Sequence, residues 1–203
     1  SRVHDVRPPH RVDVVGGGYD VVIRIARRLN DSTLTARRLA ISPLVLAAAP
    51  QYLQERGCPS HASELIKHRC LGLQGTKNTG AAWQFRSLNT SLTVPINVWV
   101  IADSYLSLVL AACSGIGFIY VPRVVIAAQL RDGSLQSVLP DLCKGIEWGV
   151  YAVHCGRAPT KNAAALIDFI REMLPTIDGV EAHQSFSQRS PAATTGNVNY
   201  SGG

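Results

Sequence analysis

Cysteine and histidine, the side chains that zinc prefers as ligands, gather in one short stretch of the sequence. Cys58 and His61 follow the pattern Cys-x-x-His, and His68 and Cys70 follow His-x-Cys. The ligand types suit a tetrahedral site, but the spacing matches no common one. We therefore predict a loop with incidental cysteine and histidine, and neither a metal site nor a cofactor.

Motifs of the common enzyme classes are absent from the sequence. There is no G-x-S-x-G nucleophile elbow and no phosphate-binding G-x-x-x-x-G-K-[ST] loop. Gly115-x-Gly117 lacks the third glycine of a dinucleotide fingerprint and follows a predicted helix instead of a strand. Asp141 and Glu147 form no carboxylate pair at a motif spacing. A Cys–His dyad between distant residues stays open, but we expect no enzyme, because scattered thiols are more often small buried hydrophobes.

Arg24 is the one basic residue in a β-branched run at residues 20–25, which predicts a buried strand. A buried charge without a partner is costly. Arg24 therefore needs either a carboxylate of the protein or an anionic ligand, and the sequence leaves both open.

The elements that must position these residues alternate between strands and helices. We predict strands at residues 20–25, 39–48 (interrupted by Pro43), 71–73, 83–85, 93–101, 118–121, 135–139 and 149–154. We predict helices at residues 50–56, 63–68, 103–113, 123–130 and 162–174. This alternation predicts an α/β protein, and buried strands followed by glycine turns and helices favour a mostly parallel sheet.

Two of the predicted helices carry more detail. The helix at 103–113 begins at Asp103 or Ser104, because either side chain can cap the first free N–H groups. The helix at 162–174 is the clearest amphipathic segment. We expect the first helix to bury Leu106, Leu108, Val109, Leu110 and Ala112, and the second to bury Ala165, Leu166, Phe169, Ile170 and Leu174. The uncharged stretch at 105–122 approaches membrane-span length, but its serines, glycines and closing proline favour a buried helix, a turn and a strand.

Composition bounds the class of protein. The chain has 203 residues, 46% hydrophobic and 17% charged, which suits one domain or two small lobes with extensive buried contact. The net charge of +6 permits an anionic partner. Its basic excess near the N-terminus lacks any recognition-helix or zinc-finger pattern, so we predict no nucleic-acid site in this chain. Five widely spaced cysteines point to reduced thiols in a cytoplasmic protein.

Six segments in register resemble the effector-binding region of LysR-type transcriptional regulators. They cover residues 12–174 and are VDVVGGGYDVVIRI (12–25), ARRLAISPLVLAAAPQYLQERGCPSHASELIKHRCL (36–71), WQF (83–85), ADSYLSLVLAACSGIGFIYVPRVV (102–125), DGSLQSVLPDL (132–142) and YAVHCGRAPTKNAAALIDFIREML (151–174). The subgroup it resembles most has a D-x-x-I-R strand and a P-x-Y-L-x-x-x-G-x-P…L-x-x-H-x-C segment.

The resemblance implies a two-lobed fold similar to type 2 periplasmic binding proteins. Residues 1–40 would form part of the first lobe, without its first strand and helix, residues 41–143 the second lobe, and residues 144–175 the return to the first. We expect residues 176–203, which lack apolar periodicity, to be a disordered tail. The crossings between lobes would fall near residues 39–46 and 139–148.

The resemblance also implies where a ligand would bind. A small effector, in many family members a carboxylate, would lie in the cleft between the lobes. By position, the ligand-binding candidates are Arg24, Ala102, Asp103 and Ser104. Ala102 stands where relatives often carry Asn, and Asp103 would repel a carboxylate unless it is turned away.

The function implied is the effector-sensing domain of a transcription regulator. Promoter DNA would be bound by a winged helix-turn-helix that precedes this region in the family, and the domain would form a homodimer or homotetramer. We expect no membrane partner. The alternative is a solute-binding protein of a transport system with the same fold.

Overall fold

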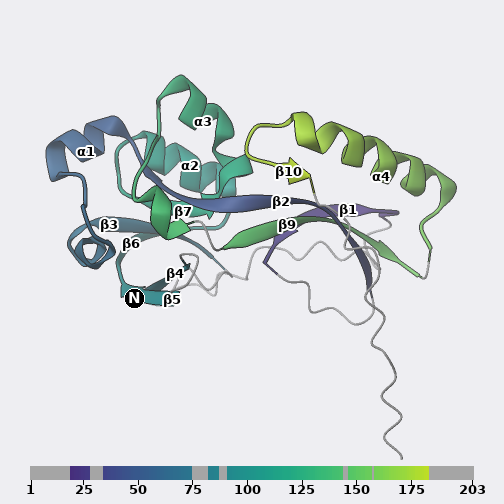
Figure 1. Ribbon diagram of the computed structural model, residues 1–203, viewed down its shortest axis with the longest axis horizontal. Helices are drawn as coiled ribbons and strands as arrows, with labels where there is room; N and C mark the ends of the chain where they lie inside the picture. The colour runs from purple at the N-terminus through teal and green to yellow at the C-terminus, as the bar shows by residue number, and fades with distance from the viewer. Residues whose placement is uncertain are drawn as a thin grey trace, which may run out of the picture.

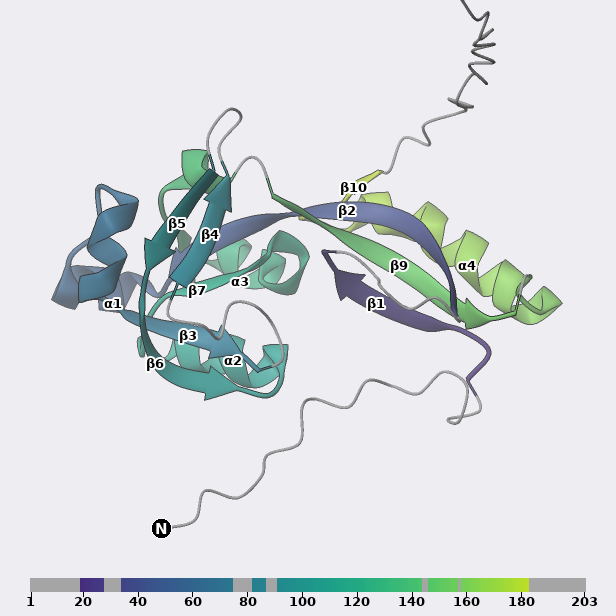
Figure 2. The ribbon, with the colours of Figure 1, turned by 90° about the horizontal axis from the view of Figure 1, so that it is seen from below.

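The computed structural model describes residues 19–27, 34–74, 82–86, 91–143, 146–156 and 158–182. One long strand, β2 (Leu34–Ala48), runs through the whole arrangement (Figure 1). It pairs antiparallel first with β9 (Glu147–Cys155) and then with β7 (Ile119–Pro122) and β8 (Gln136–Ser137). β2 and β9 therefore connect two groups of elements, which form the two lobes of the fold (Figure 2).

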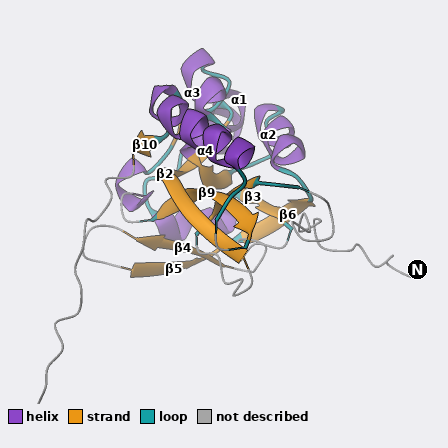
Figure 3. Cartoon of the chain, turned by 90° about the vertical axis from the view of Figure 1, so that its right-hand side faces the viewer, coloured by secondary structure: helices purple, strands orange, loops and turns teal. Residues whose placement is uncertain are grey.

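The first lobe is a small antiparallel sheet covered by one helix. Its strands follow the order β1 (Val22–Ala26), β9, β2 and β10 (Glu181–Ala182). Helix α4 (Lys161–Met173) lies across one face of this sheet (Figure 3). The Thr160 hydroxyl caps the helix by accepting from the Ala163 N–H. The core contains Leu39, Ala40, Val150, Ala152, Ile167, Leu174 and Val180.

The second lobe packs three short helices and two strand pairs around the far half of β2. The strand β3 (Arg69–Leu73) runs parallel to β6 (Asn97–Ala102), and β4 (Ala82–Arg86) forms a hairpin with β5 (Ser91–Pro95). The helices are α1 (Pro50–Arg56), α2 (Tyr105–Cys113) and α3 (Ala127–Asp132). An aromatic core of Trp83, Phe85 and Tyr120 lies beneath the hairpin, with the rings of Phe85 and Tyr120 4.7 Å apart.

The prediction of a mostly parallel sheet is wrong for the described residues. Among their paired strands only β3 and β6 are parallel, besides an isolated parallel bridge between Cys70 and Phe118. A buried apolar run bounded by glycine indicates a strand, but it does not show whether that strand runs parallel or antiparallel to its neighbours. The two crossing strands dominate the pairing, and they run in opposite directions because the chain leaves the first lobe along one and returns along the other.

Several predicted elements differ in detail. The strand predicted at 93–101 is two strands, β5 and β6, separated at Ile96, and the one at 135–139 shrinks to β8. Leu139 has a positive φ of 51° and cannot continue that strand. Strand β1 is half-buried instead of fully buried, with Ile23 41% exposed. The VDVV run at 12–15 lies outside the described residues.

The predicted buried faces of two helices are only partly right: Leu108, Val109, Ala112 and Leu174 are buried as expected, but other predicted core residues are not. On α2, Leu106 and Leu110 are 71% and 60% exposed. On α4, Leu166 and Phe169 are exposed, and the helix packs through Ala163, Ile167 and Leu174. Both helices carry apolar residues on more than one side, so that periodicity alone does not select the face that meets the sheet.

Order extends beyond residue 175, where the predicted tail begins. Residues 174–176 form a single 3₁₀ turn, and β10 then pairs with Ala40 and Ile41 of β2. The predicted boundary at residue 176 is therefore wrong, and the rest of the predicted tail, residues 183–203, lies outside the described residues. Within the described part of the chain, no helix combines the length and apolar character needed to cross a membrane.

Candidate functional site

A small groove opens where the parallel strands β3 and β6 end. Ligands of open α/β folds bind beyond the carboxyl ends of such strands. The groove is narrow: about 10 Å³ is accessible to the centre of a water-sized molecule, which is room for one water, so a larger ligand requires the groove to widen. Its walls come from β3, the start of α2, β7 and the crossing strand β9, and the residues are Leu71, Leu73, Tyr105, Leu108, Tyr120, Val121, Pro122 and Trp148.

The loop between β6 and α2 borders this groove through Tyr105. Ser104, and not Asp103, caps α2: its hydroxyl accepts from the Ser107 N–H at 3.2 Å and lies 2.9 Å from the Ser107 hydroxyl. Ala102 is buried, and its carbonyl accepts from the Gln74 N–H at 2.7 Å. Asp103 is exposed. This loop is thus fixed on both sides by hydrogen bonds, so that the start of α2 has a defined position.

The groove is aromatic and carries neutral polar groups. Burial raises the pKa of Tyr105 to about 12, and it raises the pKa of Tyr120 further. Both phenols are therefore protonated at neutral pH, and the Tyr120 hydroxyl donates to the Gln84 carbonyl at 3.4 Å. The other lining residues are aliphatic apart from Trp148, so a ligand that widened the groove would meet a largely apolar surface.

Arg24 lies on the first lobe, beside a second arginine. In the register of the sheet, Tyr151 of β9 stands between Arg24 of β1 and Arg38 of β2, and cross-strand partners share a face. Arg38 forms an ion pair with Glu147 at 3.6 Å, while its buried Nε has no hydrogen-bond partner. The ring of Tyr151 leans over Gly149, where an added Cβ would stand 2.4 Å from Cε2 of the ring.

The structure brings only part of the predicted site together. The 102–104 loop adjoins the groove, whereas Arg24 is not one of the residues that line it. The sequence did not point to two residues that line the groove, Tyr105 and Trp148. Tyr105 directly follows the predicted loop, so its neighbourhood was signalled, whereas Trp148 belongs to the crossing strand β9, which reaches the groove only in the tertiary fold.

In the stretch rich in cysteine and histidine, the buried residues pack in the core of the second lobe. His68 and Cys70 are buried beside Tyr52 and Phe118, while Cys58 is exposed. Burial raises the pKa of the Cys70 thiol to about 12, so it stays protonated and unreactive. Among the described residues, no group of three or more His, Cys, Asp or Glu side chains could hold a metal ion.

The family model described as the LysR substrate binding domain matches residues 2–175. The HTH-type transcriptional activator AaeR of Escherichia coli is 33% identical over 129 residues, which are 63% of this chain and 41% of AaeR. The chain spans less than half the length of the first curated relatives it matches.

Solved structures agree with this match. The regulatory domain of CrgA, a LysR-type transcriptional regulator from Neisseria meningitidis, superposes with a TM-score of 0.70 at 25% identity, covering 81% of this chain and 80% of that one. The full-length virulence activator AphB of Vibrio cholerae gives a TM-score of 0.64 at 26% identity, covering 80% of this chain and 55% of AphB. The two-lobed α/β fold expected from the sequence is confirmed.

Proposed function

Because the chain belongs to the LysR substrate-binding domain family, we propose that it is the effector-sensing domain of a DNA-binding transcription regulator. In this role it binds a small molecule and catalyses no reaction, and it acts in the cytoplasm. The relatives named above are regulators, which favours this function over transport of a solute. Promoter DNA would be contacted by a helix-turn-helix module of the whole protein.

The observation that carries the proposal is the groove beside Trp148. It lies where the ends of β3 and β6 meet the strands that cross between the lobes. A ligand there contacts the second lobe and a crossing strand at once. Binding would then shift the population of lobe arrangements by the difference in its affinity for each of them.

The effector we infer is a small carboxylate with an apolar body. Tyr105 and Trp148 offer surfaces for the body. The capped start of α2 favours an anion, and Arg24 and Arg38 place two guanidinium groups on one face of the first lobe. Ala102, Asp103 and Ser104 would meet the ligand through this helix start, with Asp103 turned to solvent.

Fluorescence from Trp148 tests this proposal. Aliphatic and aromatic carboxylates, each paired with its uncharged amide, are titrated into the protein while tryptophan emission and the thermal unfolding temperature are recorded. We expect at least one carboxylate to change both signals, with an affinity lowered about tenfold or more by Arg24→Ala, the loss of one charge-assisted hydrogen bond.

Two matched variants locate the signal. Trp148→Phe should abolish the fluorescence change, whereas Trp99→Phe, at an exposed position on β6, should leave it intact. If no carboxylate acts, or if amides bind equally well, the anionic effector is excluded. If Trp148→Phe leaves the signal intact, the groove is not the binding site.

We also propose the lobe boundaries expected from the sequence, with residues 41–143 as the second lobe. In support, Leu39 and Ala40 belong to the core of the first lobe and Leu44 to that of the second. On the return, Ile146, three residues past the proposed boundary, still packs in the second core, while Val150 belongs to the first. Each crossing therefore takes only a few residues.

Finally, we propose that the chain assembles with copies of itself, as a homodimer or homotetramer, through α2 and β6. These neighbouring elements expose Leu106, Leu110, Trp99 and Ile101, each more than half exposed. Large apolar side chains gathered on one surface indicate an interaction site. The guanidinium of Arg69 stacks 4.5 Å from the Trp99 ring centre, which adds a cation–π contact at the edge of this apolar face.

A further inference from the structure

The segment after α4 reaches from the first lobe to the second. It begins with the 3₁₀ turn Leu174–Thr176 and continues through Asp178 and Gly179 to β10. Val180 of this segment is buried in the core of the first lobe, and Val124, from the turn that follows β7, packs against the same core. Residues 178–180 thus lie between β2 and a turn of the second lobe.

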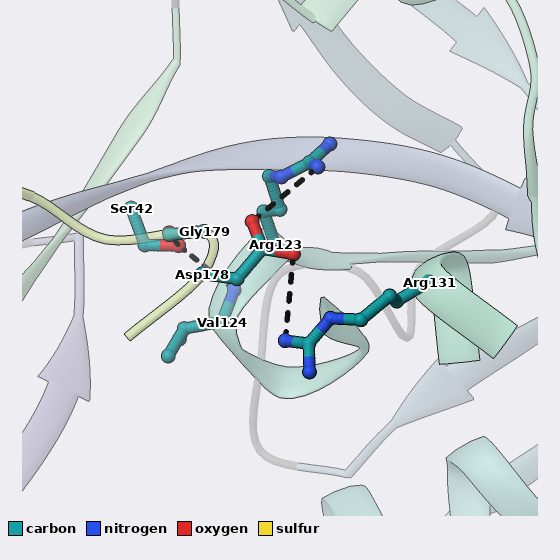
Figure 4. A network of polar contacts seen from close by, with 6 residues as sticks. All are labelled: Ser42, Arg123, Val124, Arg131, Asp178 and Gly179. Carbon is teal, nitrogen blue, oxygen red and sulfur yellow. Dashed lines mark hydrogen bonds and ion pairs between the residues drawn. The ribbon is translucent and has the colours of Figure 1, made fainter. Parts of the chain in front are cut away.

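A buried hydroxyl joins three parts of the chain at this place (Figure 4). Ser42 of β2 is fully buried. Its Oγ donates to the Gly179 carbonyl at 2.8 Å and accepts from the Val124 N–H at 3.1 Å. One side chain therefore links the crossing strand, the segment after α4 and the second lobe, through two partly buried hydrogen bonds.

The neighbouring carboxylate adds two ion pairs to the second lobe. Asp178 lies 3.5 Å from the guanidinium of Arg123 and 3.7 Å from that of Arg131 of α3 (Figure 4). These groups are partly exposed, so each pair contributes little alone. They matter because they connect the two lobes: both arginines belong to the second lobe, and the carboxylate follows the last helix of the first.

Gly179 makes the close contact possible. Its φ of 84° is one that side-chain-bearing residues rarely adopt. An added Cβ would also stand 2.9 Å from the backbone carbonyl carbon of Arg123 and 2.9 Å from the Val124 nitrogen. A larger residue at 179 would therefore separate the segment from the second lobe.

We propose that residues 178–180 form an interlobe strap, which holds the two lobes at a set angle in addition to the crossings of β2 and β9. The strap adjoins the groove by two short routes. First, Ser42 pairs across the sheet with Trp148, which lines the groove. Second, Arg123 directly follows Pro122, which also lines it. A ligand that displaces either of these residues would act on the strap, and release of the strap would alter the groove.

The test compares strap variants with a matched carboxylate variant in the full 203-residue chain. Gly179→Ala and Asp178→Asn disturb the strap. Asp168→Asn is the control, because Asp168 also pairs with two arginines, Arg37 and Arg171, but all three lie in the first lobe. Amide hydrogen exchange reports on local opening, and ¹⁹F NMR of 5-fluorotryptophan-labelled protein reports on Trp148.

For Gly179→Ala we expect exchange at residues 177–182 and 123–126 to accelerate about tenfold or more, as local opening of a hydrogen-bonded unit requires. The Trp148 resonance should shift or broaden in both strap variants. In Asp168→Asn both readouts should match the unaltered protein. Since no effector is added, failure here is distinct from failure of the proposed function.

The strap is excluded if acceleration stays confined to residues 177–182 and the Trp148 resonance is unchanged. The segment would then pack on β2 without restraining the second lobe. If Gly179→Ala does not fold, Ser42→Ala and Asp178→Asn carry the same comparison. Sodium chloride at 1 M screens exposed ion pairs. It should therefore shift the Trp148 resonance of the unaltered protein toward its position in Asp178→Asn, and an unchanged ¹⁹F spectrum at high salt counts against the ion pairs.

Discussion

His68 is a buried titratable group that packs against Tyr52 and Phe118 in the second lobe. Its Nδ1 lies 3.3 Å from the Tyr52 hydroxyl, and its ring meets that of Phe118 edge to face at 5.2 Å. Burial lowers the pKa of His68 below its usual 6.5, with only a partial opposing effect from Glu64. The folded protein therefore holds this side chain neutral under conditions in which the unfolded chain would begin to protonate it.

The sign of the resulting pH dependence follows from linkage. Because the folded-state pKa is the lower one, the unfolded state binds more protons below about pH 6.5. Stability is fully present above that pH and is lost as the pH falls through the folded-state pKa. We expect the urea midpoint to decrease between pH 7.5 and 5.5, and to decrease less in His68→Gln.

The exposed His61 provides the matched control for this measurement. In His61→Gln the midpoint should depend on pH as in the unaltered protein. If the urea midpoint depends on pH equally in His68→Gln and in the unaltered protein, His68 does not couple folding to protonation.

At the scale of elements, Gly117 sets how closely the turn after α2 approaches β3. A Cβ at this position would stand 2.4 Å from the Arg69 carbonyl oxygen. That same oxygen accepts from the Phe118 N–H at 2.8 Å, and the Phe118 carbonyl accepts from the Leu71 N–H at 2.8 Å. Glycine is thus required because two backbones touch, and not because of an unusual φ.

Replacing Gly117 should separate these two segments. We expect Gly117→Ala to lower the free energy of unfolding by about 3 kcal/mol, as overpacking against immobile backbone does, measured by urea denaturation. Ser114→Ala, on the exposed side of the same turn, removes only the hydrogen bond from the Ser114 hydroxyl to the Leu110 carbonyl and should change it by about 1 kcal/mol or less. Similar values for the two variants would contradict the close approach.

At the scale of the whole molecule, the apolar face of α2 and β6 bears on assembly. We expect Leu106→Glu combined with Leu110→Glu to lower the oligomeric state in analytical ultracentrifugation, because charges on both sides of a symmetric interface oppose burial. Stability of the single chain should hardly change, since both leucines are largely exposed already.

Helix α4 supplies the comparison for this experiment. Leu166→Glu combined with Phe169→Glu alters another exposed apolar pair, on the helix that covers the first lobe. It should leave the oligomeric state unchanged. If instead the α4 pair dissociates the oligomer and the α2 pair does not, the assembly face lies on the first lobe.

Much of the fold could be predicted because local chemistry decides it. The cap at residue 104, the glycine after α1 and the proline that ends β7 act on their own neighbours. The predicted strand at 149–154 and helix at 162–174 agree with the observed elements within two residues at each end. The family resemblance then supplied the two-lobed arrangement. The helix faces could not be predicted fully, because α2 and α4 carry apolar side chains on several sides.

The sequence by itself determined the α/β class, the positions of most elements and the loop that borders the groove, because turn residues, caps and apolar runs act over a few residues. Only the tertiary structure decided strand direction, the face each helix buries, the place of Trp148 in the groove and the contact of Ser42 with Gly179. These depend on segments far apart in the chain, and their pairing is settled when the lobes pack, not by any local pattern.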